Sequence, residues 1–93
     1  MVWTWQHITL EGLDGIEPWE VIQALSAPRR WPRPGTSNTT GLTVLTIWAR
    51  TNRGRPLLVA LRPLDKREWE IMAVRELTSA QVAELEKWEN DHG

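Results

Sequence analysis

The alternation of apolar and polar residues predicts a short first strand followed by a three-stranded meander. Residues 2–10 alternate loosely, with Trp3 and Trp5 on the same side of the predicted strand. Three later runs of β-branched and apolar residues lie between turn-forming segments, at 42–49, 57–61 and 69–74. Gly54 falls in the first of these turns and supplies the positive φ that such a hairpin loop usually needs. The second run is almost wholly apolar, which favours a central place in the sheet.

Helical spacing predicts a helix between the first strand and the meander. Pro18 suits its first turn, because the amide hydrogen that proline lacks has no partner there. The apolar residues that follow at near-helical spacing are Trp19, Val21, Ile22 and Leu25. Pro28 ends this run. We expect a loop over 27–40, because three prolines, Gly35 and a run of polar residues gather there.

The C-terminal segment predicts an amphipathic helix. Thr78 and Gln81 have the spacing of a capping box. The apolar stripe behind them consists of Val82, Leu85 and Trp88. The predicted fold is therefore a small α+β single domain over residues 1–93. It has an antiparallel three- to four-stranded sheet, one N-terminal helix and one C-terminal amphipathic helix.

The composition excludes several classes of protein. A chain of 93 residues has room for only one core. The absence of cysteine removes disulfides, thiolate nucleophiles and cysteine metal sites, and it fits a cytoplasmic location better than a secreted one. No stretch approaches the ~18 apolar residues of a membrane span, so we expect no membrane partner. Seven tryptophans without phenylalanine or tyrosine predict that tryptophan supplies the aromatic volume of the core.

Charge is sorted along the chain, although the net charge is only −1. Residues 1–28 carry four acidic groups and no lysine or arginine, whereas residues 29–75 carry ten of the eleven basic residues against three acidic ones. Residues 76–93 are acidic again, with five carboxylates against one lysine. A basic middle of this kind is expected of a surface that meets phosphate or a carboxylate-rich partner. The alternative is that these charges simply solvate strands and loops.

Arginines at strand ends are candidate phosphate ligands. Arg50 ends the first meander strand, Arg55 begins the second and Arg75 ends the third, so we expect them to rim one end of the sheet with Arg53. A guanidinium binds phosphate bidentately and stays charged at any working pH. The alternative is that the hairpin arginines are solvated and Arg75 pairs with an acid such as Glu76.

The loop before the meander adds basic residues beside an aromatic that could stack on a base. The predicted nucleic-acid-binding residues are Arg29, Arg30, Trp31, Arg33 and Arg53.

The sequence offers few residues for metal binding, nucleophilic attack or acid–base catalysis. Two histidines without suitably spaced carboxylates make no convincing metal site, and no Gly-rich phosphate loop or nucleophile elbow is present. His7 is the only credible general acid or base, although a lone strand histidine is more often structural.

Two segments resemble a known group of toxins. Residues 49–59 read Ala-Arg-Thr-Asn-Arg-Gly-Arg-Pro-Leu-Leu-Val, and residues 71–78 read Ile-Met-Ala-Val-Arg-Glu-Leu-Thr. Their order and spacing are similar to the G-R-T-x-x-G-R-x-L-x-V, I-x-S-A-R-x-A-T and terminal helix of the BrnT-like toxins of the RelE superfamily. The helix that ends at Ala27-Pro28 also resembles that group, and the similarity spans about residues 12–86.

The resemblance implies a RelE-like fold and a metal-independent, usually ribosome-independent ribonuclease that is neutralised by an antitoxin encoded beside it. The matching site positions are Arg50, Arg55 and Arg75, and His7 is at best a displaced stand-in for the family's missing Lys-His pair. The family's Glu-Arg-x-x-Tyr reads Gln-Val-Ala-Glu-Leu here, at 81–85. These departures remove candidate proton-transfer groups, which a metal-free nuclease needs. Arginines could stabilise the transition state but could not complete acid–base catalysis.

Two functions follow as hypotheses. The first is the toxin component of a bacterial, cytoplasmic type II toxin–antitoxin pair that cleaves RNA without a cofactor or metal, with a cognate antitoxin as partner. The second is a non-catalytic binding domain on the same scaffold that engages an acidic protein or nucleic acid through its basic rim. The missing proton-transfer groups favour the second. A weaker third possibility is self-association through exposed tryptophan and complementary charge, so the oligomeric state stays open.

Overall fold

The computed structural model describes residues 2–5, 15–36, 43–64 and 68–92. In chain order its elements are β1 (Val2–Trp5), α2 (Pro18–Leu25), β2 (Trp31–Thr36), β3 (Thr43–Arg50), β4 (Pro56–Pro63), β5 (Glu68–Glu76) and α3 (Ser79–His92). The predicted helix, meander and C-terminal helix are thus confirmed to within a few residues.

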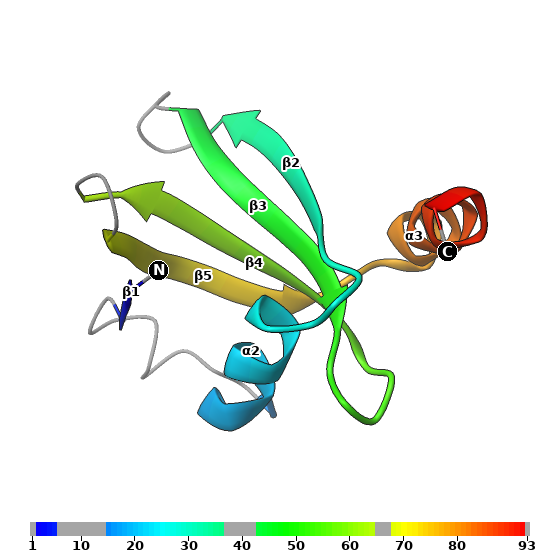
Figure 1. Cartoon of the computed structure of the whole chain (residues 1–93), viewed down its shortest axis with the longest axis horizontal. Coiled ribbons are helices and arrows are strands. Elements are labelled where there is room, and N and C mark those ends of the chain that lie inside the picture. The colour runs from blue at the N-terminus through cyan, green and yellow to red at the C-terminus, as the bar shows by residue number, and fades with distance from the viewer. Residues whose placement is uncertain (1, 6–14, 37–42, 65–67, 93) are drawn as a thin grey trace.

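The five strands form one sheet in the order β1-β5-β4-β3-β2 (Figure 1). Strands β2 to β5 pair antiparallel with one another in chain order, and β1 pairs parallel with β5. The apolar strand β4 is central, as its sequence predicts. Helix α2 lies against one face of the sheet, and α3 stands at the end of the sheet beyond β5 (Figure 1). The predicted α+β class is confirmed.

Helix α2 begins where side chains satisfy its first amide groups. The amide of Glu17 donates to the carboxylate of Glu20 over 3.1 Å, and Pro18 occupies the first turn, where no donor is needed. The buried inner face of the helix consists of Val21, Ala24 and Leu25. These residues pack on β-sheet residues Ile47, Leu57, Val59, Leu61 and Ile71. Each large aliphatic side chain contributes about 1.5–3 kcal/mol on burial, so this layer is the main apolar core.

Tryptophan does not fill this core, contrary to the expectation from composition. The largest fully buried side chains are Leu25, Leu57, Leu61, Ile71, Leu85, Val21 and Val59. Trp48 is buried on the other side of the sheet, whereas Trp19 is 50% exposed on α2. Successive residues of a strand point to opposite faces, so Ile47 enters the core under α2 and Trp48 points away from it. We call the face away from α2 the outer face; it carries Trp31, Arg33, Trp48, Arg50 and Leu58.

The prediction of a loop over 27–40 is wrong where β2 forms, and the last residues of that range lie outside the described chain. β2 is an edge strand, paired antiparallel with β3. Pro32 and Pro34 are two residues apart, so both of their missing amide hydrogens face the same side, and an open edge tolerates that loss. The hydroxyl of Thr46 adds a bond to the carbonyl of Arg33 (2.7 Å).

Helix α3 is capped as the sequence predicts. The Gln81 amide donates to the Thr78 hydroxyl over 3.2 Å, and the Thr78 amide donates to the Gln81 side-chain oxygen over 3.0 Å. The cluster under this helix combines buried Trp48, Leu77 and Leu85 with half-buried Trp31, Leu58, Val82 and Trp88. Helix α3 thus meets the sheet through side chains at its outer face. Neither helix of the described segments has the length and hydrophobicity needed to cross a lipid bilayer.

Shortening a core side chain under α2 should destabilise the protein far more than the same change at the surface. Leu61→Ala removes buried atoms from β4 and leaves a cavity, so the free energy of unfolding should fall by about 2–5 kcal/mol. Leu64→Ala, at a residue 44% exposed, should change it by less than about 0.5 kcal/mol. Urea unfolding followed by circular dichroism measures both, and equal losses would contradict a core between α2 and β4.

Candidate functional site

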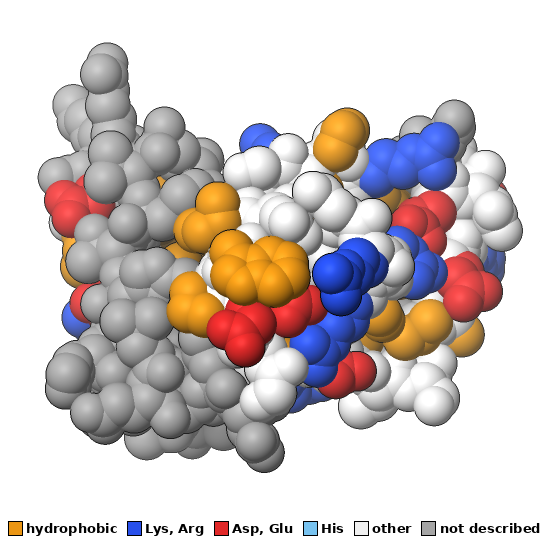
Figure 2. Space-filling model, turned by 90° about the horizontal axis from the view of Figure 1, so that it is seen from below, with side chains coloured by type: hydrophobic (Ala, Val, Ile, Leu, Met, Phe, Trp, Pro, Cys, Tyr) orange, Lys and Arg blue, Asp and Glu red, His pale blue; other side chains and the backbone are white. Residues whose placement is uncertain are grey.

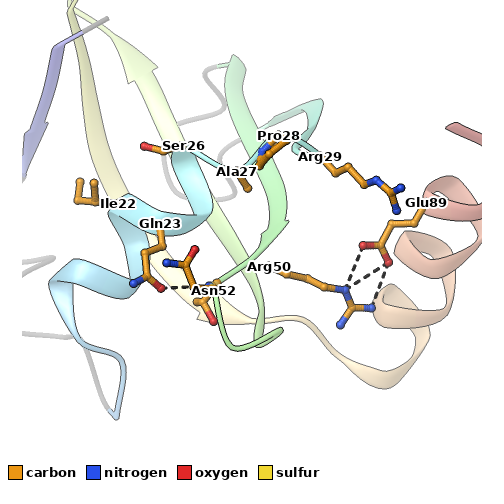
Figure 3. Close-up of a pocket in the computed structure, with 10 residues that line it drawn as sticks. Ile22, Gln23, Ser26, Ala27, Pro28, Arg29, Arg50, Asn52 and Glu89 are labelled. Atoms are coloured by element: carbon orange, nitrogen blue, oxygen red, sulfur yellow. Dashed lines mark hydrogen bonds and ion pairs between the residues drawn. The ribbon is translucent and has the colours of Figure 1, made fainter. Parts of the chain in front are cut away.

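A pocket of about 610 Å³ lies between the end of α2, the turn that joins β3 to β4, and α3 (Figure 3). Its walls come from segments far apart in the sequence, at 22–29 and 50–52 and at Glu89. Arg29 and Arg50 extend toward Glu89 from two different walls (Figure 3). The pocket therefore unites a predicted catalytic arginine with a predicted nucleic-acid-binding arginine.

Arg50 is bound to α3 by a carboxylate. Its Nε lies 3.1 Å from Oε2 of Glu89, and its Nη2 lies 3.2 Å from Oε1. The Nη1 group donates to the carbonyl of Gly54 over 3.0 Å, which fixes the guanidinium against the turn. The two side chains are 31% and 17% exposed, so solvent still reaches the pair. A phosphate that binds Arg50 must therefore compete with the carboxylate of Glu89.

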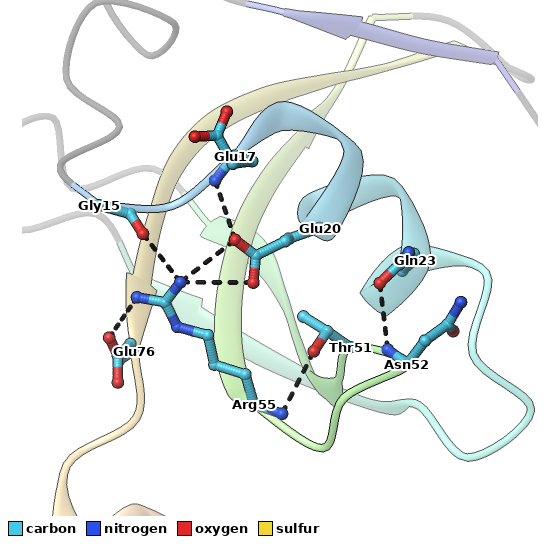
Figure 4. Close-up of polar contacts among 8 residues, drawn as sticks. All are labelled: Gly15, Glu17, Glu20, Gln23, Thr51, Asn52, Arg55 and Glu76. Carbon is cyan, nitrogen blue, oxygen red and sulfur yellow. Dashed lines mark hydrogen bonds and ion pairs between the residues drawn. The ribbon is translucent and has the colours of Figure 1, made fainter.

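The turn that carries this arginine is held by its own hydrogen bonds. Gly54 has a φ of 86°, as the sequence predicts, and its amide donates to the carbonyl of Thr51 (2.9 Å). The buried hydroxyl of Thr51 accepts from the amide of Arg55 (3.2 Å). The amide of Asn52 donates to the side-chain oxygen of Gln23 (3.1 Å), which joins the turn to α2 (Figure 4). The pocket wall is therefore tied to the main core.

Arg55 lies away from the pocket and forms hydrogen bonds with residues near the start of α2 and at the end of β5. Its Nη1 donates to the carbonyl of Gly15 over 2.8 Å and to the carboxylate of Glu20 over 3.2 Å (Figure 4). Its Nη2 donates to the carboxylate of Glu76. These bonds join the start of α2, the β3–β4 turn and the end of β5. Arg55 is thus committed to holding three elements together.

Electrostatics support this reading of Arg55. The pKa of Glu20 lies below its ordinary value, chiefly because the Glu17 amide donates to its carboxylate. Burial opposes this shift, and the hydrogen bond and charge of the Arg55 guanidinium lower the pKa further. The hydrogen bond to Glu76 raises the pKa of Arg55. Each charge is therefore stabilised by its partner, which is typical of an ion-pair network.

The three predicted catalytic arginines do not meet in one site. Arg50 and Arg75 bind residues of α3, because Nη1 of Arg75 donates to the side-chain oxygen of Gln81 (2.9 Å). Arg55 turns the other way, toward α2. The prediction of a shared rim overlooked that side chains at neighbouring strand ends can leave the sheet on opposite faces. His7, the predicted acid or base, lies outside the described residues.

The predicted nucleic-acid-binding residues are also divided. Arg30 donates to the carbonyl of Leu25 over 3.2 Å and so closes the end of α2. Arg33 lies over the rings of Trp31 and Trp48, with its guanidinium carbon 4.5 and 4.6 Å from their centroids. Arg53 is exposed in the β3–β4 turn. Of this set, the structure places Arg29 in the pocket with Arg50 and gathers Trp31 and Arg33 under α3.

The sequence did not identify the acidic partners of these arginines. Glu89 binds Arg50, and Glu84 binds Arg33 over 2.8 Å. The signal was present in the sorting of charge, because the acidic C-terminal block and the basic middle attract each other, but that pattern does not give the pairs. Figure 2 shows acidic and basic side chains next to each other on the face it views.

The described residues contain no group of three or more histidine, cysteine, aspartate or glutamate side chains that could hold a metal ion. The geometry instead offers guanidinium groups, amides and hydroxyls at an accessible pocket, which suit an anionic ligand such as phosphate.

In comparison with known proteins, the chain matches no family model, and no curated protein matches it.

Acid should weaken the fold through Glu20. Its pKa is lower in the folded than in the unfolded chain, so the unfolded state binds more protons in the acidic range and the free energy of unfolding falls as pH drops. In Glu20→Gln this dependence should be shallower between about pH 5 and pH 3. Urea midpoints across that range measure it. Glu86→Gln, at an exposed residue of α3, controls for loss of one carboxylate, and equal slopes in both variants would contradict the role of Glu20.

Proposed function

We propose that this chain is the toxin component of a type II toxin–antitoxin pair and that its target is RNA. The observation that carries the proposal is the meeting of Arg29 and Arg50 in one pocket. Arg50 belongs to the segment that resembles BrnT-like toxins, and Arg29 comes from the basic segment before the sheet. Two guanidinium groups on different walls of a pocket suit a phosphodiester, which presents charged oxygens on two sides.

The proposed chemistry is cleavage of the RNA backbone without a metal. Arg50 would hold the phosphate and stabilise the charge that develops on it in the transition state, and Arg29 would contribute to the same field. In this step the 2′-oxygen would attack the phosphorus while the bond from phosphorus to the 5′-oxygen breaks, so the 2′-hydroxyl loses a proton and the leaving 5′-oxygen gains one. His7 is our proposed acid or base for one of these two transfers, and water would serve the other. The setting we propose is the bacterial cytoplasm, with an antitoxin as the controlling partner.

A second candidate is a non-catalytic domain that binds RNA or an acidic protein. The observation that favours it is that all three predicted catalytic arginines already have partners within the chain, including Arg50 with Glu89. Arg55 is held by Glu20 and Glu76, and Arg75 is held by Gln81. Both candidates use Arg29 and Arg50, so they are separated by cleavage rather than by binding.

Removing the pocket charge should abolish toxicity. Inducing the wild-type chain alone should arrest bacterial growth, and Arg50→Gln should restore it, because the neutral side chain no longer binds phosphate. Arg62→Gln is a matched control: Arg62 is also a sheet arginine in an ion pair, with Glu70 at 2.6 Å, but it does not line the pocket. Growth curves with both variants, checked for folding by circular dichroism, measure the effect.

The two candidates are then distinguished by mapping RNA ends after incubation with pure protein. New ends that require Arg50 identify a ribonuclease, whereas bound but intact RNA identifies a binding domain. Normal growth with the wild-type chain, or arrest that Arg50→Gln leaves unchanged, would contradict the toxin proposal.

A further inference from the structure

Helix α3 contacts the outer face of the sheet through a stacked tryptophan pair. The ring of Trp88 lies parallel to that of Trp31, with centroids 5.4 Å apart and an angle of 6° between the planes. Trp48 meets Trp31 edge-on at 5.5 Å. Nucleic-acid-binding proteins hold an unpaired base in the same way, by stacking it parallel on the ring of an aromatic side chain. Trp88 therefore occupies a position that a base could take.

Two carboxylates of the same helix form ion pairs with the arginines on either side of this stack. Glu84 lies 2.8 Å from Nη1 of Arg33, and Glu89 lies 3.1 Å from Nε of Arg50. Both arginines belong to the outer face, one on β2 and one on β3. A phosphate oxygen makes the same charge-assisted bond to a guanidinium as a carboxylate oxygen does. The helix thus presents one ring and two anionic groups to this face.

A buried donor without a partner lies beneath α3. Trp48 is only 6% exposed, and its indole Nε1 is inaccessible to solvent. This Nε1 has no hydrogen-bond acceptor within the described chain. Burying a donor without a partner opposes folding, so most buried polar groups find one. This N–H is satisfied neither by α3 nor by the sheet. An acceptor such as a base carbonyl or a phosphate oxygen would satisfy it.

The attachment of α3 is correspondingly limited. Among the α3 residues whose burial the structure describes, only Leu85 is buried, and Val82 and Trp88 are half-buried. Both side chains of the ion pair between Glu84 and Arg33 are more than one-third exposed, and such exposed pairs contribute little to stability. Figure 1 shows the helix standing beyond the end of β5, joined to it by a short segment. Among the described residues, the core cluster under α2 contains no residue of α3, so that core does not depend on the contact between α3 and the outer face.

We propose that α3 covers a nucleotide-binding subsite on the outer face of β2 and β3, and that single-stranded RNA replaces the helix there. Trp31 would stack a base in place of Trp88, Arg33 and Arg50 would take phosphates in place of the two carboxylates, and Trp48 Nε1 would gain an acceptor. This subsite rests on the proposed function and extends it, because Arg50 also lines the pocket. An acidic peptide segment, α3 itself, already uses the ring of Trp31 and both arginines but leaves Trp48 Nε1 without an acceptor. RNA is favoured as the competing occupant because a nucleotide brings a stacking base, a phosphate and further acceptor oxygens together.

Neutralising the two covering carboxylates should strengthen RNA binding. In Glu84→Gln, Glu89→Gln the affinity for a short single-stranded RNA should rise on the order of tenfold, equivalent to about 1.4 kcal/mol shared between one exposed and one partly buried ion pair. The matched control is Glu86→Gln, Asp91→Asn, which makes the same change of charge at exposed positions of α3. A 2′-O-methyl RNA, which lacks the attacking hydroxyl, gives an equilibrium Kd by fluorescence anisotropy.

Two further measurements test the stack and the movement of the helix. Adding Trp31→Leu to the first double variant should remove most of the gain in affinity, and Trp31→Phe, which keeps a ring, should retain most of it. Hydrogen exchange of the α3 amides should become faster when RNA binds, although binding usually slows exchange. Circular dichroism confirms that each variant folds.

Several results would overturn the subsite. Equal gains in the two double variants would assign the effect to net charge, and weaker binding by Glu84→Gln, Glu89→Gln would make α3 part of the RNA site. Release of α3 by polyglutamate but not by RNA would make the occupant an acidic protein. The toxin proposal fails separately: Arg50-dependent growth arrest without a gain in affinity overturns only the subsite, whereas the gain without arrest overturns only the toxin.

Discussion

The guanidinium of Arg55 ties α2, the β3–β4 turn and the end of β5 together, and the position of the pocket depends on this contact. Glu20 receives both the Arg55 guanidinium and the amide that begins α2, so one carboxylate fixes the helix start and the turn at once. The same turn is bound to α2 a second time, through Asn52 and Gln23. These bonds hold the turn that follows Arg50 against α2, and the segment after α2 carries Arg29 on another wall of the same pocket.

This arrangement gives two arginines at the ends of one short turn different surroundings. Arg50 and Arg55 are five residues apart, yet one faces α3 and the other faces α2. The charge of Arg55 is balanced by Glu20 and Glu76 in a partly buried setting, where removal of one partner leaves an unpaired charge. The charge of Arg50 is balanced by a single carboxylate at a pocket that solvent reaches. A ligand anion can replace that carboxylate, whereas the network around Arg55 leaves no such exchange.

The two layers of the protein differ in how firmly they are held. Helix α2 buries three aliphatic side chains against a sheet whose own core residues are fully covered. Among the described residues of helix α3 only Leu85 is fully buried, and the helix is otherwise held by half-buried Val82, a tryptophan stack and ion pairs. Apolar burial scales with area and exposed ion pairs contribute little, so the packing of α2 on the sheet contributes more to stability than the attachment of α3 does. The acidic C-terminal block thus lies against the basic middle within one chain.

The sequence by itself determined the helices, the meander, the central place of β4, the positive φ of Gly54 and the capping of α3, because periodicity, turn residues and caps act over a few neighbouring positions. It did not determine β2, since prolines that indicate a loop are also accepted on an edge strand. Only the tertiary structure decided that Arg50 and Arg55 leave opposite faces, that Trp31 stacks on Trp88, and that Glu89 reaches Arg50. Those contacts join residues distant in sequence, and their partners depend on how layers pack rather than on local pattern.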